Sequence, residues 1–179
     1  MPRRYQVALF ALALIAPWGA WAASPALITT LVHLLESKGL SAPQAQTAAA
    51  TAKHRYPGSA LAPIVTSVKG IRRLPATYYA HGALKRPVAN GLTHVLLAAF
   101  TQRAAPQRVR GATNAYTRAV AQGAPPQTTG QLLIHALQHG ANTARLKALV
   151  AAYLRQYKAG ASAHNALHNA EGKLAHYGL

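Results

Sequence analysis

The sequence predicts an all-α protein in which antiparallel helical hairpins form either a compact bundle or a short α-solenoid of about 6 to 8 helices. Three observations support this prediction. The chain is rich in Ala, Leu and Gln, and it has few of the alternating β-branched runs that strands require. Glycines and prolines, 13 and 11 in number, recur along the chain as punctuation between segments with helical periodicity.

Residues 1–22 have the pattern of a secretory signal peptide. Arg3 and Arg4 form a positive start, an apolar stretch follows from residue 7 to 16, and Ala20-Trp21-Ala22 supplies a small-x-small cleavage site. We expect cleavage after Ala22, which leaves residues 23–179 as a single helical domain in the periplasm or outside the cell. The alternative is an uncleaved membrane anchor, which the shortness of the apolar run disfavours. No membrane span is expected after cleavage.

Two helices are predicted in the first third of the mature chain. Ser24-Pro25 starts the first one, which Gly39 ends. Ser41 and Gln44 have the spacing of a capping box and start the second, which runs to about Tyr56 and has an interior of Ala and Thr. A short apolar segment then covers residues 59–68.

The middle of the chain combines one irregular region with two long helices. Residues 69–87 contain two glycines and two prolines, so they are predicted to be mainly loop. Apolar stripes then predict one helix over about residues 88–102 and another that starts at Pro106 and ends at Gly123.

The last third is the most regular part. Gly123, Gly140, Gly160 and Gly178 are 17, 20 and 18 residues apart, and the first three begin a similar phrase in which a helix stops and a new one starts. Such short links place consecutive helices antiparallel. The resulting helix-pair period is near 37 residues.

The charge is one-sided, because 19 basic residues stand against 2 glutamates, without any aspartate or cysteine. This composition excludes disulfides, thiolate metal sites, cysteine nucleophiles and Ser-His-Asp triads. The unusual feature is the scarcity of acidic residues, since basic residues are about as frequent as in ordinary proteins. Carboxylates are protonated below a pH of about 4, so acid solvent favours their removal. The alternative is a basic protein that binds anionic partners.

Basic and aromatic residues alternate in the irregular region, as they do in sites for polyanions. A site there would bind lipopolysaccharide, an acidic polysaccharide or nucleic acid, although the export signal argues against cytoplasmic nucleic acid. The alternative is a solvated connection whose tyrosines pack back onto the helices. The candidate residues are Lys69, Arg72, Arg73, Tyr78, Tyr79, Lys85 and Arg86.

Two pairs of histidines are spaced four residues apart, which places each pair on one helix face and allows chelation of a metal ion. The pairs are His135 with His139 and His164 with His168, and Glu171 falls on the same flank as the second pair. The alternative is that these histidines are solubilising surface residues in a chain short of acidic ones. The hypothesis of a metal site also conflicts with the hypothesis of an acidic compartment, because histidines protonated in acid cannot bind metal.

These observations predict an exported, non-enzymatic binding or scaffold protein of the cell envelope. Its partner would be an anionic polymer or a protein, and no cofactor is predicted. Basic residues spread evenly over the surface would favour adaptation to acid alone, whereas one contiguous basic groove would favour a polyanion site.

Overall fold

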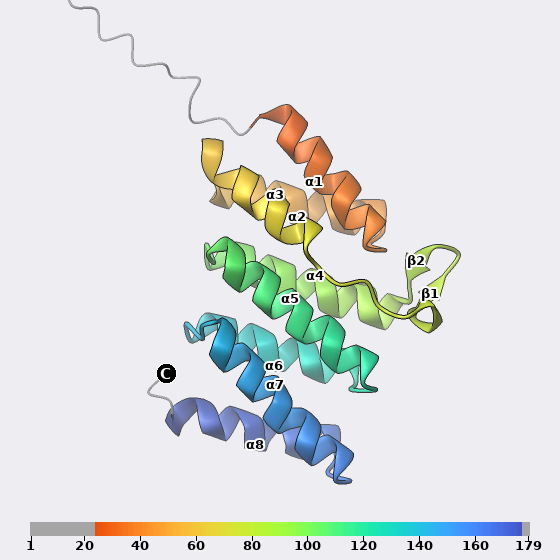
Figure 1. Cartoon of the computed structure of the whole chain (residues 1–179), viewed down its shortest axis with the longest axis vertical. Coiled ribbons are helices and arrows are strands. Elements are labelled where there is room, and N and C mark those ends of the chain that lie inside the picture. The colour runs from red at the N-terminus through yellow and green to blue at the C-terminus, as the bar shows by residue number, and fades with distance from the viewer. Residues whose placement is uncertain (1–23, 177–179) are drawn as a thin grey trace, which may run out of the picture.

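The computed structural model describes residues 24–176 and contains eight α-helices, which confirms the all-α prediction (Figure 1). The predicted signal peptide, residues 1–22, lies outside the described residues. A 3₁₀ turn at Gly58–Ala60 precedes α3, and a second one at Ala76–Tyr78 precedes a small hairpin of β1 (Tyr79–Ala80) and β2 (Ala83–Leu84). The helices are α1 (Pro25–Ser37), α2 (Ala42–Arg55), α3 (Leu61–Lys69), α4 (Arg86–Thr101), α5 (Pro106–Ala121), α6 (Pro126–Gln138), α7 (Thr143–Lys158) and α8 (Ala163–His176).

The helices form two layers that lie one behind the other in Figure 1, and within each layer the helices follow one another along the long axis of the molecule. In one layer α1 contacts α3, α3 contacts α5 and α5 contacts α7, while in the other α2, α4, α6 and α8 follow each other in the same way. The main contacts therefore join helices that are one or two places apart in the chain. This is the stacked form of the two predicted arrangements, and it makes neighbouring helix pairs structurally equivalent.

The repeated glycines end helices in one recurrent geometry. Gly123 has a φ of 90°, and the N–H of the following Ala124 donates to the carbonyl of Ala119 at 3.1 Å. This is a Schellman motif, in which a left-handed residue lets the chain turn back and satisfies the last carbonyls. The buried residue after the turn then leads into the next helix. The same turn recurs at Gly39, Arg103, Gly140 and Gly160, where the N–H of the following residue again donates to a carbonyl five positions earlier.

Arg103 is the exception among these turns, because it adopts a φ of 48° without being glycine. We expect Arg103→Gly to raise the free energy of unfolding by about 0.5–1 kcal/mol, since glycine removes the left-handed strain but adds entropy to the unfolded chain. Urea unfolding measures the change. Gly140 occupies the equivalent turn and has open space around its missing side chain. Gly140→Arg should therefore lower stability by a similar amount, and equal stability of both variants with the parent would contradict the assignment.

Two short elements were not predicted from the sequence. The apolar segment at residues 59–68 is largely helix α3, and it tolerates Pro63 because that proline lies in the first turn, where an N–H has no intrahelical partner. Within residues 69–87, predicted as loop, His81 and Gly82 have φ values of 49° and 82° and close a two-residue hairpin. Such a turn needs positive φ at both positions. The hairpin is anchored where the Leu84 N–H donates to the Gly39 carbonyl at 2.8 Å.

The pair α4–α5 and the pair α6–α7 are two copies of one unit, offset by 37 residues. The offset relates the start of α5 to the start of α7, and it relates Tyr116 to Tyr153. Both tyrosines are completely buried between the layers. The hydroxyl of Tyr116 donates to the carbonyl of Val88 in α4 at 2.9 Å. The period near 37 predicted from the glycines is thus the period of the structural unit.

Several helix C-termini are capped by the long side chains of other elements. Tyr78 Oη donates to the Val120 carbonyl of α5 at 2.6 Å, and Arg108 Nη2 donates to the Leu137 carbonyl of α6 at 2.7 Å. Lys38 Nζ donates to the carbonyl of Lys69, the last residue of α3, at 2.9 Å, while Tyr56 Oη donates to the Ala104 carbonyl in the turn after α4 at 2.8 Å. Cations and hydroxyls suit the negative end of a helix dipole. No helix of the described chain has an acidic residue in its first turn, so this capping scheme contains no group that titrates in acid.

The buried tyrosines predict a loss of stability in alkali. Burial raises the pKa of Tyr56 to about 12 and also raises the pKa of Tyr116 and of Tyr153. Because these hydroxyls ionise more easily in the unfolded chain, stability should be intact below pH 10 and should fall as the pH rises above it. For Tyr56 alone the loss approaches about 2 kcal/mol.

Urea titrations at pH 8, 10 and 11.5 measure this effect. Tyr56→Phe serves as the control, because in this variant the free energy of unfolding should fall less steeply with rising pH. Lys38 acts in the opposite direction up to its ordinary pKa, since burial and then the charge of Arg73 lower its pKa. A flat alkaline profile would contradict the prediction.

Candidate anion-binding groove

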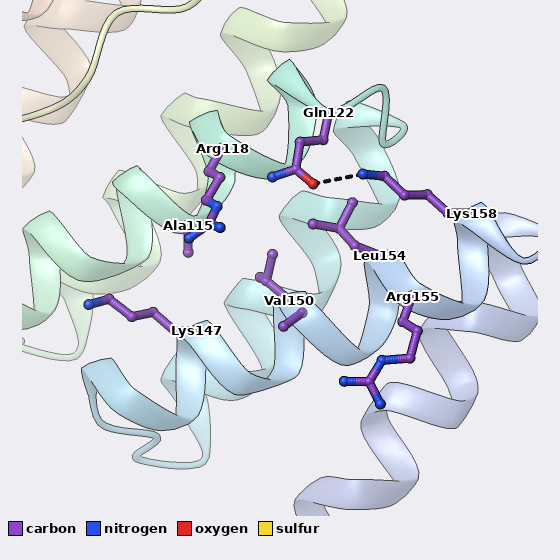
Figure 2. A pocket seen from close by; sticks show the side chains of 9 residues that line it. Ala115, Arg118, Gln122, Lys147, Val150, Leu154, Arg155 and Lys158 are labelled. Carbon is purple, nitrogen blue, oxygen red and sulfur yellow. Dashed lines mark hydrogen bonds between the residues drawn. The ribbon is translucent and has the colours of Figure 1, made fainter.

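A groove runs along the seam between α5 and α7. It consists of three adjoining pockets of about 590, 190 and 280 Å³, and Lys147 lines all three. The first begins at Gly70, where α3 ends, and the last finishes at Gln122 and Lys158, at the ends of α5 and α7. We call this feature the α5–α7 groove. Figure 2 shows its third pocket and the side chains of α5 and α7 that line it.

The floor of that pocket is apolar. Ala115 of α5 and Val150 and Leu154 of α7 line it, with 6%, 3% and 7% of their surfaces exposed. These residues belong to the inner stripes of their helices, which pack against each other and against the second layer. The floor of this pocket is therefore fixed by the core.

Six cationic residues line the groove. They are Arg72, Arg110, Arg118, Lys147, Arg155 and Lys158. All six are exposed. Arg110 and Lys147 are 37 residues apart, and so are Arg118 and Arg155, so each pair occupies equivalent positions of the two repeated units. The repeat thus places two rows of positive charge across the seam.

Asn114 of α5 attaches one end of the groove to the irregular region. Its Oδ1 accepts the backbone N–H of Arg72 at 2.8 Å, and its Nδ2 donates to the Gly70 carbonyl at 3.3 Å. At the other end, Lys158 Nζ donates to Gln122 Oε1 at 2.9 Å and bridges the two helices (Figure 2). The amide neutralises no charge, so the cation remains available to an anion.

Both carboxylates of the described chain lie elsewhere, and each one contacts a histidine. His33 Nδ1 is 3.4 Å from Glu36 Oε2 within α1, and His135 Nδ1 is 2.5 Å from Glu171 Oε1 between α6 and α8. Among the described residues, neither Glu nor His lines any of the three pockets of the groove. Its positive field is therefore unopposed at close range, which attracts and concentrates anions.

The seven residues predicted as a polyanion site have different surroundings in the structure. Arg72 joins the α5–α7 groove, whereas Arg73 donates to the Ser37 carbonyl at 3.0 Å. Tyr78 and Tyr79 are half-buried and donate to the carbonyls of Val120 and Lys38, so they pack back onto the helices as the alternative held. Three others are exposed away from the groove, namely Lys69, Lys85 and Arg86.

Arg86 instead lines a hollow of about 640 Å³ on the other layer, between α4 and α6. This hollow is framed mainly by uncharged groups, among them Asn90, Gln127, Gln131 and Ile134. The two layers therefore differ in character, because the cations gather on the α5–α7 side. The loop residues were singled out because they are close in sequence, while the groove residues are close only after the layers form.

The predicted metal set is also separated. The structure pairs Glu171 with His135 of α6. His139 caps the end of α6, while His164 and His168 belong to α8. Within residues 24–176, no three His or Glu side chains lie close enough together to hold a metal ion. The His135–Glu171 pair ties α8 to α6.

Sequence reasoning missed five of the six groove residues. A signal for them was present, because Arg110 and Arg118 recur as Lys147 and Arg155 at the helix-pair period.

Comparison with protein-family models, with curated proteins and with solved structures finds no match to this chain. No helix within residues 24–176 has both the length and the apolar character needed to cross a membrane.

Proposed function

We propose that the protein is an exported, non-enzymatic binding protein of the cell envelope that holds an anionic polymer in its α5–α7 groove. The observation that carries this proposal is the gathering of six cations along one seam that no carboxylate lines. Oppositely charged polymers release counterions when they bind such a surface, which provides most of the affinity. The apolar floor adds a surface for the polymer backbone.

The proposal combines the two classes predicted from the sequence. The rarity of carboxylates fits an acid-exposed compartment, and it also leaves the groove without competing internal anions. The side chains that cap helices and the side chains that line the groove belong to different residues, although both groups include basic ones. A protein partner in place of a polymer is the second candidate, and it would require an acidic segment to match the groove.

The double variant Arg118→Gln/Lys147→Gln should weaken the binding of a polyanion about tenfold at moderate salt, because it removes two charges from the groove. Fluorescence anisotropy with labelled dextran sulfate measures the affinity. The slope of log affinity against log salt should fall by about 2 as well, since each lost phosphate or sulfate contact reduces it by about 1.

The matched control is Lys53→Gln/Lys85→Gln, which changes the net charge equally at exposed positions outside the groove. It should retain most of the affinity. If both double variants lose the same affinity, binding depends on net charge alone and the groove is not the site.

A further inference from the structure

The lining of the α5–α7 groove is insensitive to acid. Its polar members are arginines, lysines, the amides of Gln107, Asn114 and Gln122, and the hydroxyl of Thr143. As residue types, arginine and lysine ordinarily stay protonated between pH 2 and pH 8, and amides and hydroxyls carry no charge over that range. The chain has nine histidines, yet none of those whose side chains the structure describes lines the groove. The positive field of the groove therefore persists in acid.

The fold beneath the groove has the same property. The helix ends are capped by Tyr, Lys and Arg donors on backbone carbonyls. The ion pairs that involve carboxylates are at α1 and between α6 and α8, away from the seam. Asn114 and Lys158 hold the two ends of the groove through amide hydrogen bonds. Acid thus removes nothing that shapes the groove.

A partner that works in acid must keep its own charge. Carboxylates become neutral below a pH of about 4, so a polymer of uronic acids or an acidic peptide would lose its attraction to the groove. Sulfate esters and phosphodiesters are strong acids and stay charged. Their oxygens also match the planar guanidinium groups of Arg110, Arg118 and Arg155, which bind oxyanions in a bidentate manner.

The arrangement of the cations favours a linear ligand. Arg110 and Lys147 lie at equivalent positions on neighbouring helices of one layer, as do Arg118 and Arg155, and such helices are about 10 Å apart. A chain that follows the seam meets these pairs in succession. A single compact anion would contact only one of them.

We propose that the ligand of the α5–α7 groove is a linear polymer that carries strong-acid oxyanions, either sulfate esters or phosphoryl groups, and that it binds equally well in acid and at neutral pH. This inference rests on the proposed function and specifies the class of ligand. The two sources share one chemistry, so separate probes must distinguish them.

The test measures the affinity of the protein for three labelled polymers, at pH 3 and at pH 7 and at one ionic strength. Dextran sulfate represents sulfate esters, inorganic polyphosphate represents phosphoryl groups, and polygalacturonate represents carboxylates. We expect the affinity for at least one of the first two to change less than threefold between the two pH values. Polygalacturonate should lose at least tenfold at pH 3. Whichever of dextran sulfate and polyphosphate binds with the higher affinity shows whether the natural ligand carries sulfate esters or phosphoryl groups.

Several outcomes would overturn the inference. One is a tenfold loss of both strong-acid polymers at pH 3 while circular dichroism shows a folded protein, and another is unfolding of the protein at pH 3. Undiminished polygalacturonate binding at pH 3 would also contradict it, as would stronger binding to anionic phospholipid vesicles than to every free polymer. If no polyanion binds at pH 7, the proposed function itself fails. Loss of binding in Arg118→Gln/Lys147→Gln, but not in Lys53→Gln/Lys85→Gln, places a positive result in the groove.

Discussion

At pH 2 the protein should keep about nine-tenths of the helical circular dichroism signal that it has at pH 7, in a buffer with moderate salt. Ordinary proteins lose stability in acid because carboxylates that are paired or hydrogen-bonded in the folded state become protonated. This chain has two side-chain carboxylates, and both are half-buried partners of histidine. Exposed ion pairs contribute about 0–1 kcal/mol each, so their loss removes little.

The opposing force in acid is repulsion among the cations. Protonation of nine histidines adds to a formal net charge of +17, and a large net charge destabilises compact states. Salt anions screen exposed charges, and the groove provides a place where they concentrate. We therefore expect acid stability to rise with salt and, at pH 3, to rise most with sulfate, which is mainly divalent at that pH.

The control is Glu36→Gln/Glu171→Gln, a variant without any acidic side chain. Its acid profile should match that of the parent, because glutamine is an uncharged analogue of a protonated glutamate. A cooperative loss of helix with a midpoint above pH 3 in the parent would contradict the acid prediction. If the variant instead proved much less stable than the parent at pH 7, the two His–Glu pairs would have a larger role than their exposure implies.

Local signals predicted most of the fold. Glycine stops, proline starts and the Ser41–Gln44 capping box depend only on neighbouring residues, and they mark helix boundaries in the structure, except that Gly178 lies outside the described residues. The hairpin around Gly82 was missed because each strand has two residues, which is too short for an alternating pattern. Arg103 was missed as a turn residue because its left-handed conformation is imposed by the packing of the next helix, although the equivalent Gly140 was recognised.

The groove required information that local patterns do not contain. Which cations share a surface depends on the alternation of helices between two layers, and this brings α5 beside α7 across the intervening α6. The residues singled out at 69–87 are neighbours in sequence, yet tertiary contacts send Arg72, Arg73 and Arg86 to three different places. The candidate metal residues were likewise chosen from helix spacing, which fixes a face but not the helix opposite that face.

The contact between Gly91 and Tyr116 gives the second large prediction, in which Gly91→Ala lowers the free energy of unfolding by about 2 kcal/mol. A Cβ at Gly91 would lie 2.8 Å from Tyr116 Cζ and would also meet its hydroxyl oxygen. Tyr116 has no room to move, because it is completely buried and its hydroxyl is bonded to the Val88 carbonyl. The overpacking outweighs the helix propensity that Ala gains over Gly, about 1 kcal/mol.

Gly130 is the matched control, since it lies in α6 directly across from Gly91. A Cβ there would be 3.6 Å from the Cα of Gly91, which is ordinary contact, so Gly130→Ala should be neutral or stabilising by up to about 1 kcal/mol. Tyr116→Phe removes the nearest obstructing atom, and its combination with Gly91→Ala should lose at least about 1 kcal/mol less than the two single variants together. Urea unfolding of all four variants measures this coupling. Additive losses would mean that the helices move apart at this contact and so relieve the overlap. Equal effects at Gly91 and Gly130 would mean that helix propensity, and not the fit around Tyr116, determines the cost of the added methyl group.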